Sequence, residues 1–145
     1  AAPHSFLSIN EDGKSSIIKS TGNKDAHLIL RGGATGPNYH AEHIRVAEET
    51  LTKHKLPLNI VVDCSHDNSN KNYKNQGAVL RNILAQKQAG NTSIKGIMLE
   101  SHIHEGKQSL NMGHKEELAY GVSITDGCIS FEDTDGLLRE MYSVL

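Results

Sequence analysis

The sequence predicts a mixed α/β fold whose strands run parallel. Three short runs rich in Ile, Leu and Val recur about every 34 residues, and a segment with helical periodicity follows each run. Strands and helices that alternate in this way are joined by right-handed crossovers, which makes the strands parallel. Each run also ends close to one charged or ionisable residue. We therefore expect three βα units whose functional groups meet at one side of a sheet.

The first half of the chain is expected to form a hairpin, a strand and a helix. Apolar runs at 6–9 and 15–19 flank the turn-rich residues 10–13, a pattern typical of an antiparallel hairpin. A buried strand over 28–31 ends at two glycines, which suit either a loose turn or a backbone that approaches an anion. A helix over 40–54 follows. The apolar residues on one face of this helix are Ala41, Ile44, Ala47 and Leu51.

The second half repeats the alternation. A strand over 58–63 leads into a polar segment and then a helix, and a third strand is expected over 94–100. A loop over 102–125 precedes the last helix, for which Ser130 is the expected N-cap. The apolar stripe of the middle helix comprises Val79, Leu80, Ile83 and Leu84, and the residues expected to face inward on the last helix are Leu137, Leu138, Met141 and Leu145.

Composition limits the class of protein. The chain has 145 residues, a formal net charge of -2 and 37% apolar residues, which suits one globular domain. It has no basic stripe for nucleic acid and no apolar run that could cross a membrane, so we expect small molecules or other subunits as partners and a cytoplasmic location. Cys64 and Cys128 form no CxxC pair, and we expect reduced thiols, with Cys64 packed as a small hydrophobe.

Arg31, His66 and Glu100 follow the three expected strands and should converge at one face. Active-site residues occupy that position in a (β/α)8 barrel. Taken singly, His66 also suits an ordinary loop histidine, and Arg31 or Glu100 suits an ion pair or a helix cap. Three units are fewer than half of a barrel, which typically needs about 250 residues. The pattern alone therefore leaves open a small open sheet or the C-terminal part of something larger.

Five motifs resemble those of one enzyme family, in order and over essentially the whole chain. They are Pro3-His4 to Leu7, Ile29-Leu30-Arg31-Gly32-Gly33 with Pro37-Asn38-Tyr39, Asp63 with Ser65-His66 and Asn68-Ser69, Glu100-Ser101 with Glu105-Gly106, and Tyr120-Gly121 with Ser123-Ile124-Thr125-Asp126. The family is 3-deoxy-D-arabino-heptulosonate 7-phosphate (DAHP) synthase, the first enzyme of the shikimate pathway of aromatic amino acid biosynthesis, in its amino-acid-inhibited bacterial and fungal form. The resemblance implies a (β/α)8 TIM barrel. Residues 1–145 would be its C-terminal segment, with a regulatory hairpin at 5–20 and the last three βα units at 27–145.

The resemblance also implies a reaction and its site. Such an enzyme is a transferase that condenses phosphoenolpyruvate with erythrose 4-phosphate, giving DAHP and phosphate. His66, Glu100 and Asp126 match the family's divalent-metal ligands, a set that suits Mn²⁺, Fe²⁺, Co²⁺ or Zn²⁺. Arg31 matches the arginine that grips phosphoenolpyruvate. We therefore expect Arg31 and His66 to be the catalytic and substrate-binding residues.

Part of the family's site has no counterpart in this sequence. The family's fourth metal ligand is a cysteine on the first barrel strand, to which neither Cys64 nor Cys128 corresponds. Its Lys-Pro-Arg-Thr segment, which binds substrate, also lies upstream of the matched region. We therefore expect the 145-residue chain to be inactive alone and to need an N-terminal barrel half. Its exposed strand edges should also favour a homo-oligomer.

The hairpin has a separate role by resemblance. Phe6, Ser8 and Ile18 match positions that line the site where an aromatic amino acid inhibits the enzyme. Ser8, in place of glycine, favours phenylalanine as the inhibitor and leaves tryptophan as the alternative.

Two other interpretations of the function stay open. One is a related metal barrel such as 3-deoxy-D-manno-octulosonate 8-phosphate synthase, or an unrelated metal-dependent hydrolase with the same His, Glu and Asp set. The inserted hairpin and the Arg-Gly-Gly segment disfavour both of these. The other is a non-catalytic fragment that binds an effector without turnover.

Overall fold

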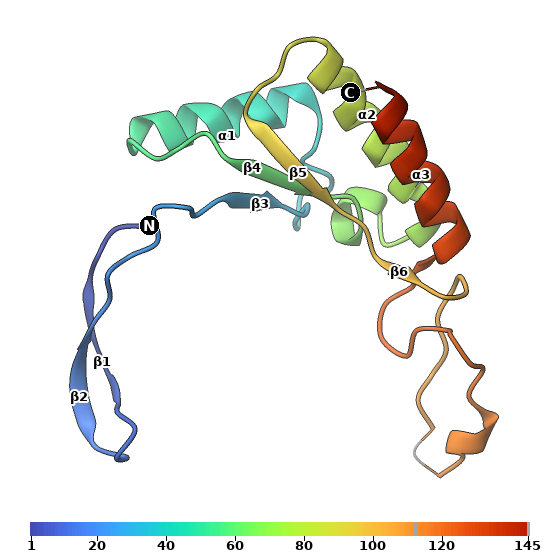
Figure 1. Cartoon of the computed structure of the whole chain (residues 1–145), viewed down its shortest axis with the longest axis horizontal. Coiled ribbons are helices and arrows are strands. Elements are labelled where there is room, and N and C mark those ends of the chain that lie inside the picture. The colour runs from blue at the N-terminus through green and yellow to red at the C-terminus, as the bar shows by residue number, and fades with distance from the viewer. Residues whose placement is uncertain (112, 145) are drawn as a thin grey trace.

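Strands and helices alternate in the order that the sequence predicts (Figure 1). The computed structural model describes residues 1–111 and 113–144, so Leu145, which was expected to face inward, lies outside the described residues. The strands are β1 (Ser5–Ile9), β2 (Ser15–Lys19), β3 (Leu28–Leu30), β4 (Ile60–Asp63), β5 (Ile94–Met98), β6 (Ser101–His102) and β7 (Ile129–Ser130). The helices are α1 (Ala41–Lys53), α2 (Gln76–Gln88) and α3 (Phe131–Val144), with short 3-10 helices η1 (His66–Ser69), η2 (Tyr73–Asn75) and η3 (Lys115–Glu117).

The central sheet contains three parallel strands in the order β3, β4, β5. Leu30 pairs with Val62, and Val62 pairs with Ile97, so the predicted parallel arrangement is confirmed. β4 lies in the middle and is largely buried, whereas Ile29 of β3 is 42% exposed. The expectation that the first strand is buried is therefore wrong. β3 is an edge strand, and no helix in the described part of the chain covers the face on which Ile29 lies.

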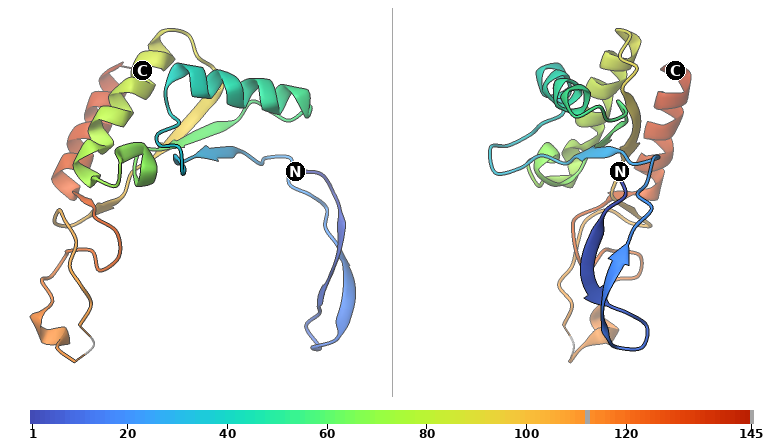
Figure 2. Two further views of the ribbon diagram at one scale, coloured as in Figure 1. Left: turned by 180° about the vertical axis from the view of Figure 1, so that it is seen from behind. Right: turned by 90° about the vertical axis from the view of Figure 1, so that its left-hand side faces the viewer.

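Helices α1 and α2 cover one face of the sheet, and α3 packs beside α2 (Figure 2). The buried core between sheet and helices includes Ile44, Ala47, Leu51, Ile60, Val62, Cys64, Val79, Leu80, Ile83, Leu84 and Ile94. The burial of Ile44, Leu80 and Ile83 follows from their helical spacing, which turns all three toward the sheet. Of the helices in the described ranges, none has the length and apolar content that crossing a membrane requires.

The last helix begins as predicted, with Ser130 as its N-cap. The Ser130 hydroxyl accepts a hydrogen bond from the Asp133 backbone N–H (3.0 Å) and donates one to the Asp133 carboxylate (2.7 Å). Leu137 is buried, but Leu138 is 43% exposed, so the prediction that Leu138 faces inward is wrong. Successive residues of a helix lie about 100° apart, and the stripe that packs on the core continues from Leu137 to Met141.

The segment between β5 and α3 is more ordered than the sequence predicts. β6 lies at the start of the expected loop, and β7 lies shortly after its end. The two strands form a parallel pair, with Ser101 opposite Ile129 and His102 opposite Ser130. Two residues a strand are too few to give a periodic signal in the sequence. This pair matters for the site because it brings the residues before β7 next to the end of β5.

The predicted antiparallel hairpin is present, with Phe6 opposite Ile18. It extends away from the sheet (Figures 1 and 2). Leu7, Ile9 and Ile17 are each at least 70% exposed, so this face of the hairpin has no cover within the described residues.

Candidate metal centre and active site

A cavity of about 570 Å³ lies at the carboxyl ends of the parallel strands. Arg31, His66 and Glu100 all line it, as expected of residues that follow parallel strands, and Asp126 joins them from the segment before β7. Its other lining residues are Ser65, Asp67, Ser69, Lys71, Asn72, Tyr73, Lys107 and Gly127. The candidate residues from four separate parts of the sequence therefore share one cavity.

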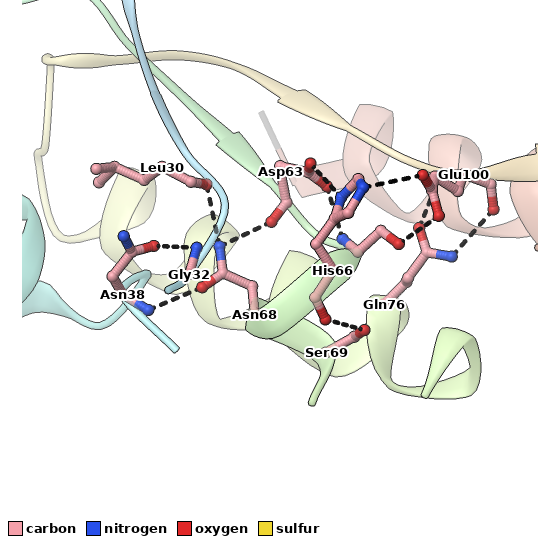
Figure 3. Close-up of polar contacts among 10 residues, drawn as sticks. Leu30, Gly32, Asn38, Asp63, His66, Asn68, Ser69, Gln76 and Glu100 are labelled. Carbon is pink, nitrogen blue, oxygen red and sulfur yellow. Dashed lines mark hydrogen bonds and ion pairs between the residues drawn. The ribbon is translucent and has the colours of Figure 1, made fainter. Parts of the chain in front are cut away.

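His66 begins η1, three residues beyond the end of β4, and has a backbone conformation with φ of 50°. A positive φ is costly for a residue with a Cβ and tends to occur at functional sites. The imidazole Nδ1 lies 2.7 Å from the Asp63 carboxylate, and Nε2 lies 3.4 Å from a Glu100 carboxylate oxygen (Figure 3). The histidine ring is therefore held between a buried carboxylate and a half-buried one.

Glu100 is held by its backbone as well as by its side chain. Its N–H donates to the Gln76 side-chain oxygen (2.8 Å), and its C=O accepts from the Gln76 side-chain NH₂ (3.0 Å), as Figure 3 shows. The Ser65 hydroxyl donates to the second carboxylate oxygen of Glu100 at 2.6 Å. Gln76 is fully buried. Just beyond the end of β5, its amide makes the two backbone hydrogen bonds that a neighbouring strand would otherwise make.

His66, Glu100 and Asp126 each offer one ligand atom, and these three atoms lie within 4.8 Å of one another. One imidazole and two carboxylates are a donor set that divalent transition metals accept. Asp126 is exposed, whereas His66 and Glu100 are half-buried, so the group opens toward the solvent on the Asp126 side. The geometry and chemistry of the three donors therefore fit a divalent cation.

Arg31 projects into the same cavity from a backbone that is fixed on both sides. Asn68 donates through its side-chain NH₂ to the Leu30 carbonyl at 3.0 Å, and the Gly32 N–H donates to the Asn38 side-chain oxygen at 2.7 Å. The two asparagines are linked, because the Asn38 backbone N–H donates to the Asn68 side-chain oxygen at 2.8 Å. The loop that bears Arg31 is thus tied to η1, which bears His66 (Figure 3).

The model of the DAHP synthetase I family matches residues 1–139 of this chain. The chain belongs to the DAHP synthetase I family. It is 47% identical over 145 residues to the Tyr-sensitive phospho-2-dehydro-3-deoxyheptonate aldolase of Escherichia coli K12, covering 100% of this chain and 40% of the relative. It is 49% identical over 140 residues to the Phe-sensitive aldolase of the same organism, covering 97% of this chain and 39% of that relative. The chain therefore spans about two fifths of the length of these curated relatives.

The fold is similar to that of a solved family member. The structure of phospho-2-dehydro-3-deoxyheptonate aldolase from Francisella tularensis SCHU S4 superposes with a TM-score of 0.89 at 38% sequence identity. The match covers 99% of this chain and 41% of the other.

The sequence gives no signal for several contacts that organise this cavity in the DAHP synthetase I family chain. Gln76 occurs in none of the five motifs, and its contact with Glu100 spans 24 residues. Asp63, Asn38 and Asn68 do occur in motifs, but spacing alone assigns them no partner. Lys71 and Lys107 bring positive charge to the cavity wall and were not anticipated.

The three residues expected to bind an inhibitor lie together on one face of the hairpin. Phe6 and Ile18 are opposite each other, and Ser8 lies two residues along the same strand, so the three side chains point the same way. Phe6 is 43% exposed. The hairpin extends away from the sheet of β3, β4 and β5 in the left view of Figure 2.

Cys64 is expected to resist alkylation in the folded protein. Burial, with a smaller contribution from the Asp63 carboxylate, raises the pKa of the Cys64 thiol to about 12. The thiolate is the reactive form, and at pH 8 only about one such thiol in ten thousand is ionised. Iodoacetamide at pH 8 followed by peptide mass spectrometry should find Cys64 unmodified in buffer and modified in urea. Rapid modification without denaturant would contradict the complete burial of Cys64 in the core.

Proposed function

We propose that this chain supplies the metal-binding part and one phosphoenolpyruvate contact of a DAHP synthase active site. That enzyme joins phosphoenolpyruvate to erythrose 4-phosphate and releases DAHP and phosphate. The observation that carries the proposal is the convergence of His66, Glu100, Asp126 and Arg31 on one cavity in a member of the DAHP synthetase I family. An unrelated metal-dependent hydrolase would not require an arginine on this wall.

We infer that the three-stranded sheet is a segment of a (β/α)8 barrel, with the regulatory hairpin at 5–20 and three βα units at 27–145. Three features support this inference. The strands are parallel, helices cover one face only, and β3 pairs on one side only within the described chain. Further strands from an N-terminal half would pair with the free edge and close the uncovered face into a barrel interior.

His66, Glu100 and Asp126 would hold the divalent metal in this proposal. Bound there, Mn²⁺, Fe²⁺, Co²⁺ or Zn²⁺ would supply Lewis-acid polarisation of an aldehyde oxygen. Arg31 binds the phosphate or the carboxylate of phosphoenolpyruvate, because a planar guanidinium can donate two parallel hydrogen bonds to either group. Lys71 and Lys107 add positive charge along the same wall, which favours two anionic substrates over neutral ones.

The hairpin would bind the aromatic amino acid that inhibits the enzyme, through Phe6, Ser8 and Ile18. Two observations support this role. The three side chains share one face of the hairpin, and the relatives are named as Tyr-sensitive and Phe-sensitive enzymes.

Turnover is expected only when this chain is combined with an N-terminal barrel half. Arg31 and three metal ligands hold only part of the two substrates, and a misplacement of about 1 Å can cost about 100-fold in rate. The assay is loss of phosphoenolpyruvate in the presence of erythrose 4-phosphate and Mn²⁺, with the N-terminal portion of the E. coli Phe-sensitive relative added or omitted. Loss of phosphoenolpyruvate is expected only when both chains and erythrose 4-phosphate are present.

The matched control for this assay compares two histidines. His66→Ala should abolish turnover of the combined chains, whereas His102→Ala should not, because His102 is exposed and does not line the cavity. Full activity of the pure 145-residue chain would overturn the proposal that the site is shared. A combined protein that binds phenylalanine without any turnover would favour the non-catalytic reading instead.

A further inference from the structure

Asp63 is a buried carboxylate that lies beside the metal-binding group without belonging to it. It is 3% exposed, and it ends β4 three residues before His66. One carboxylate oxygen accepts the Ser65 N–H at 2.8 Å, and the other lies 2.7 Å from His66 Nδ1. Its backbone carbonyl accepts the Asn68 side-chain NH₂ at 2.8 Å. Both the backbone and the side chain of Asp63 are therefore fixed.

The contact with Asp63 decides which nitrogen of His66 can bind a metal. A neutral imidazole carries one N–H and one lone pair, on different ring nitrogens. A carboxylate can only accept, so the contact at 2.7 Å requires the hydrogen to be on Nδ1. The lone pair is then on Nε2, which is the nitrogen that faces Glu100 at 3.4 Å.

Asp63 has a second role, which is to support the unusual backbone conformation of His66. His66 has φ of 50°, a conformation that is unfavourable for a residue with a Cβ unless the surroundings maintain it. The Asp63 side chain spans this turn, because it accepts from the Ser65 N–H on one side and contacts the His66 ring on the other. It therefore holds the ring on the side of Glu100 despite the unfavourable backbone.

We propose that Asp63 is a positioning residue that sets His66 to bind the metal through Nε2. This inference rests on the metal site of the proposed function and adds a residue outside its ligand set. Carboxylates that orient a ligating histidine in this way typically affect metal affinity about 10- to 100-fold.

Asp63→Asn tests the inference with almost no change of shape. The asparagine oxygen can keep the Ser65 N–H, and its NH₂ then donates to His66 Nδ1. The hydrogen of the imidazole must move to Nε2, where it occupies the site of the lone pair. We expect the affinity of the full chain for Mn²⁺, measured by calorimetric titration of the metal alone, to fall about 10- to 100-fold.

Asp63→Ala is the matched comparison, because it removes the same charge without imposing a tautomer. If Asp63 acts by orienting His66, Asp63→Ala should retain more affinity for Mn²⁺ than Asp63→Asn. Circular dichroism of both variants checks that the fold is intact. Equal losses in the two variants would indicate a simple charge effect and overturn the inference, as would an Asp63→Asn protein that binds Mn²⁺ as tightly as the parent.

A second measurement does not depend on metal. Nitrogen-15 NMR of the imidazole in the metal-free chain at pH 8 should find the proton on Nδ1 in the parent and on Nε2 in Asp63→Asn. If the parent chain binds no Mn²⁺, the proposed metal site is wrong. The tautomer found by NMR would still show whether Asp63 sets the position of the proton on His66. A proton on Nε2 in the parent would overturn the inference directly.

Discussion

Asn68→Leu is expected to cost about 3 kcal/mol or more of the free energy of unfolding. The Asn68 side chain is 2% exposed and makes three hydrogen bonds to backbone groups. Its NH₂ donates to the carbonyls of Leu30 (3.0 Å) and Asp63 (2.8 Å), and its oxygen accepts the Asn38 N–H (2.8 Å). Leucine has a similar volume and would fill the space, but it would make none of these three hydrogen bonds. A buried backbone group that is left without a partner costs about 1–3 kcal/mol.

This loss is large because domains of this size are stable by only about 5–15 kcal/mol. Urea unfolding followed by circular dichroism should therefore find a much lower midpoint for Asn68→Leu. Gln88→Leu is the matched control, since it exchanges an exposed amide at the end of α2 for the same side chain. We expect it to change stability by no more than about 0.5 kcal/mol. An Asn68→Leu chain that unfolds at the same urea concentration as Gln88→Leu would mean that the asparagine contacts do not stabilise the fold.

The order of elements could be predicted from the sequence because it depends on local periodicity. Ile44 and Leu51 recur at helical spacing, and Ile60 to Val62 form a short β-branched run between helices, so both signals are contained in a few adjacent residues. The predicted and observed boundaries of these elements therefore agree closely. Parallel pairing followed from the alternation alone, without knowledge of any long-range contact.

Features that depend on contacts between distant residues could not be predicted. The β6–β7 pair joins strands of two residues, and Gln76 reaches Glu100 across 24 positions. Leu138 has the same chemistry as Leu137, and only the packing of α3 on α2 decides which of them is buried. The candidate ligands were found by resemblance to a family, whereas the residues that orient them required the structure.

Gly32 is another residue whose contacts could not be predicted. The sequence is compatible with either a loose turn or a backbone that approaches an anion at this position. The φ of Gly32 is 78°, and a Cβ added there would lie 2.6 Å from the Asp67 Cβ and 2.8 Å from the Asn68 backbone nitrogen. The close approach is therefore to the protein itself, at η1. Only glycine allows the residue after Arg31 to pack this tightly on the turn that carries His66.

Gly32→Ala is therefore expected to damage both stability and substrate binding. The left-handed conformation costs about 1–2 kcal/mol for a residue with a Cβ, and the overlap with Asp67 adds to that cost. Relief of the overlap requires the end of β3 to move away from η1, which separates Arg31 from His66. We expect a lower midpoint of urea unfolding, and a weaker apparent affinity for phosphoenolpyruvate when the chain is assayed with an N-terminal half.

Gly33→Ala is the control, because it adds the same methyl group one residue along the chain. A Cβ at Gly33 has no atom within 4 Å, and its backbone is outside the left-handed region. This variant should differ from the parent by no more than about 0.5 kcal/mol in stability and should keep its affinity for phosphoenolpyruvate. If Gly32→Ala behaves like Gly33→Ala, the contact between β3 and η1 does not set the position of Arg31. If only Gly32→Ala is impaired, the distance between Arg31 and His66 depends on the absence of one methyl group.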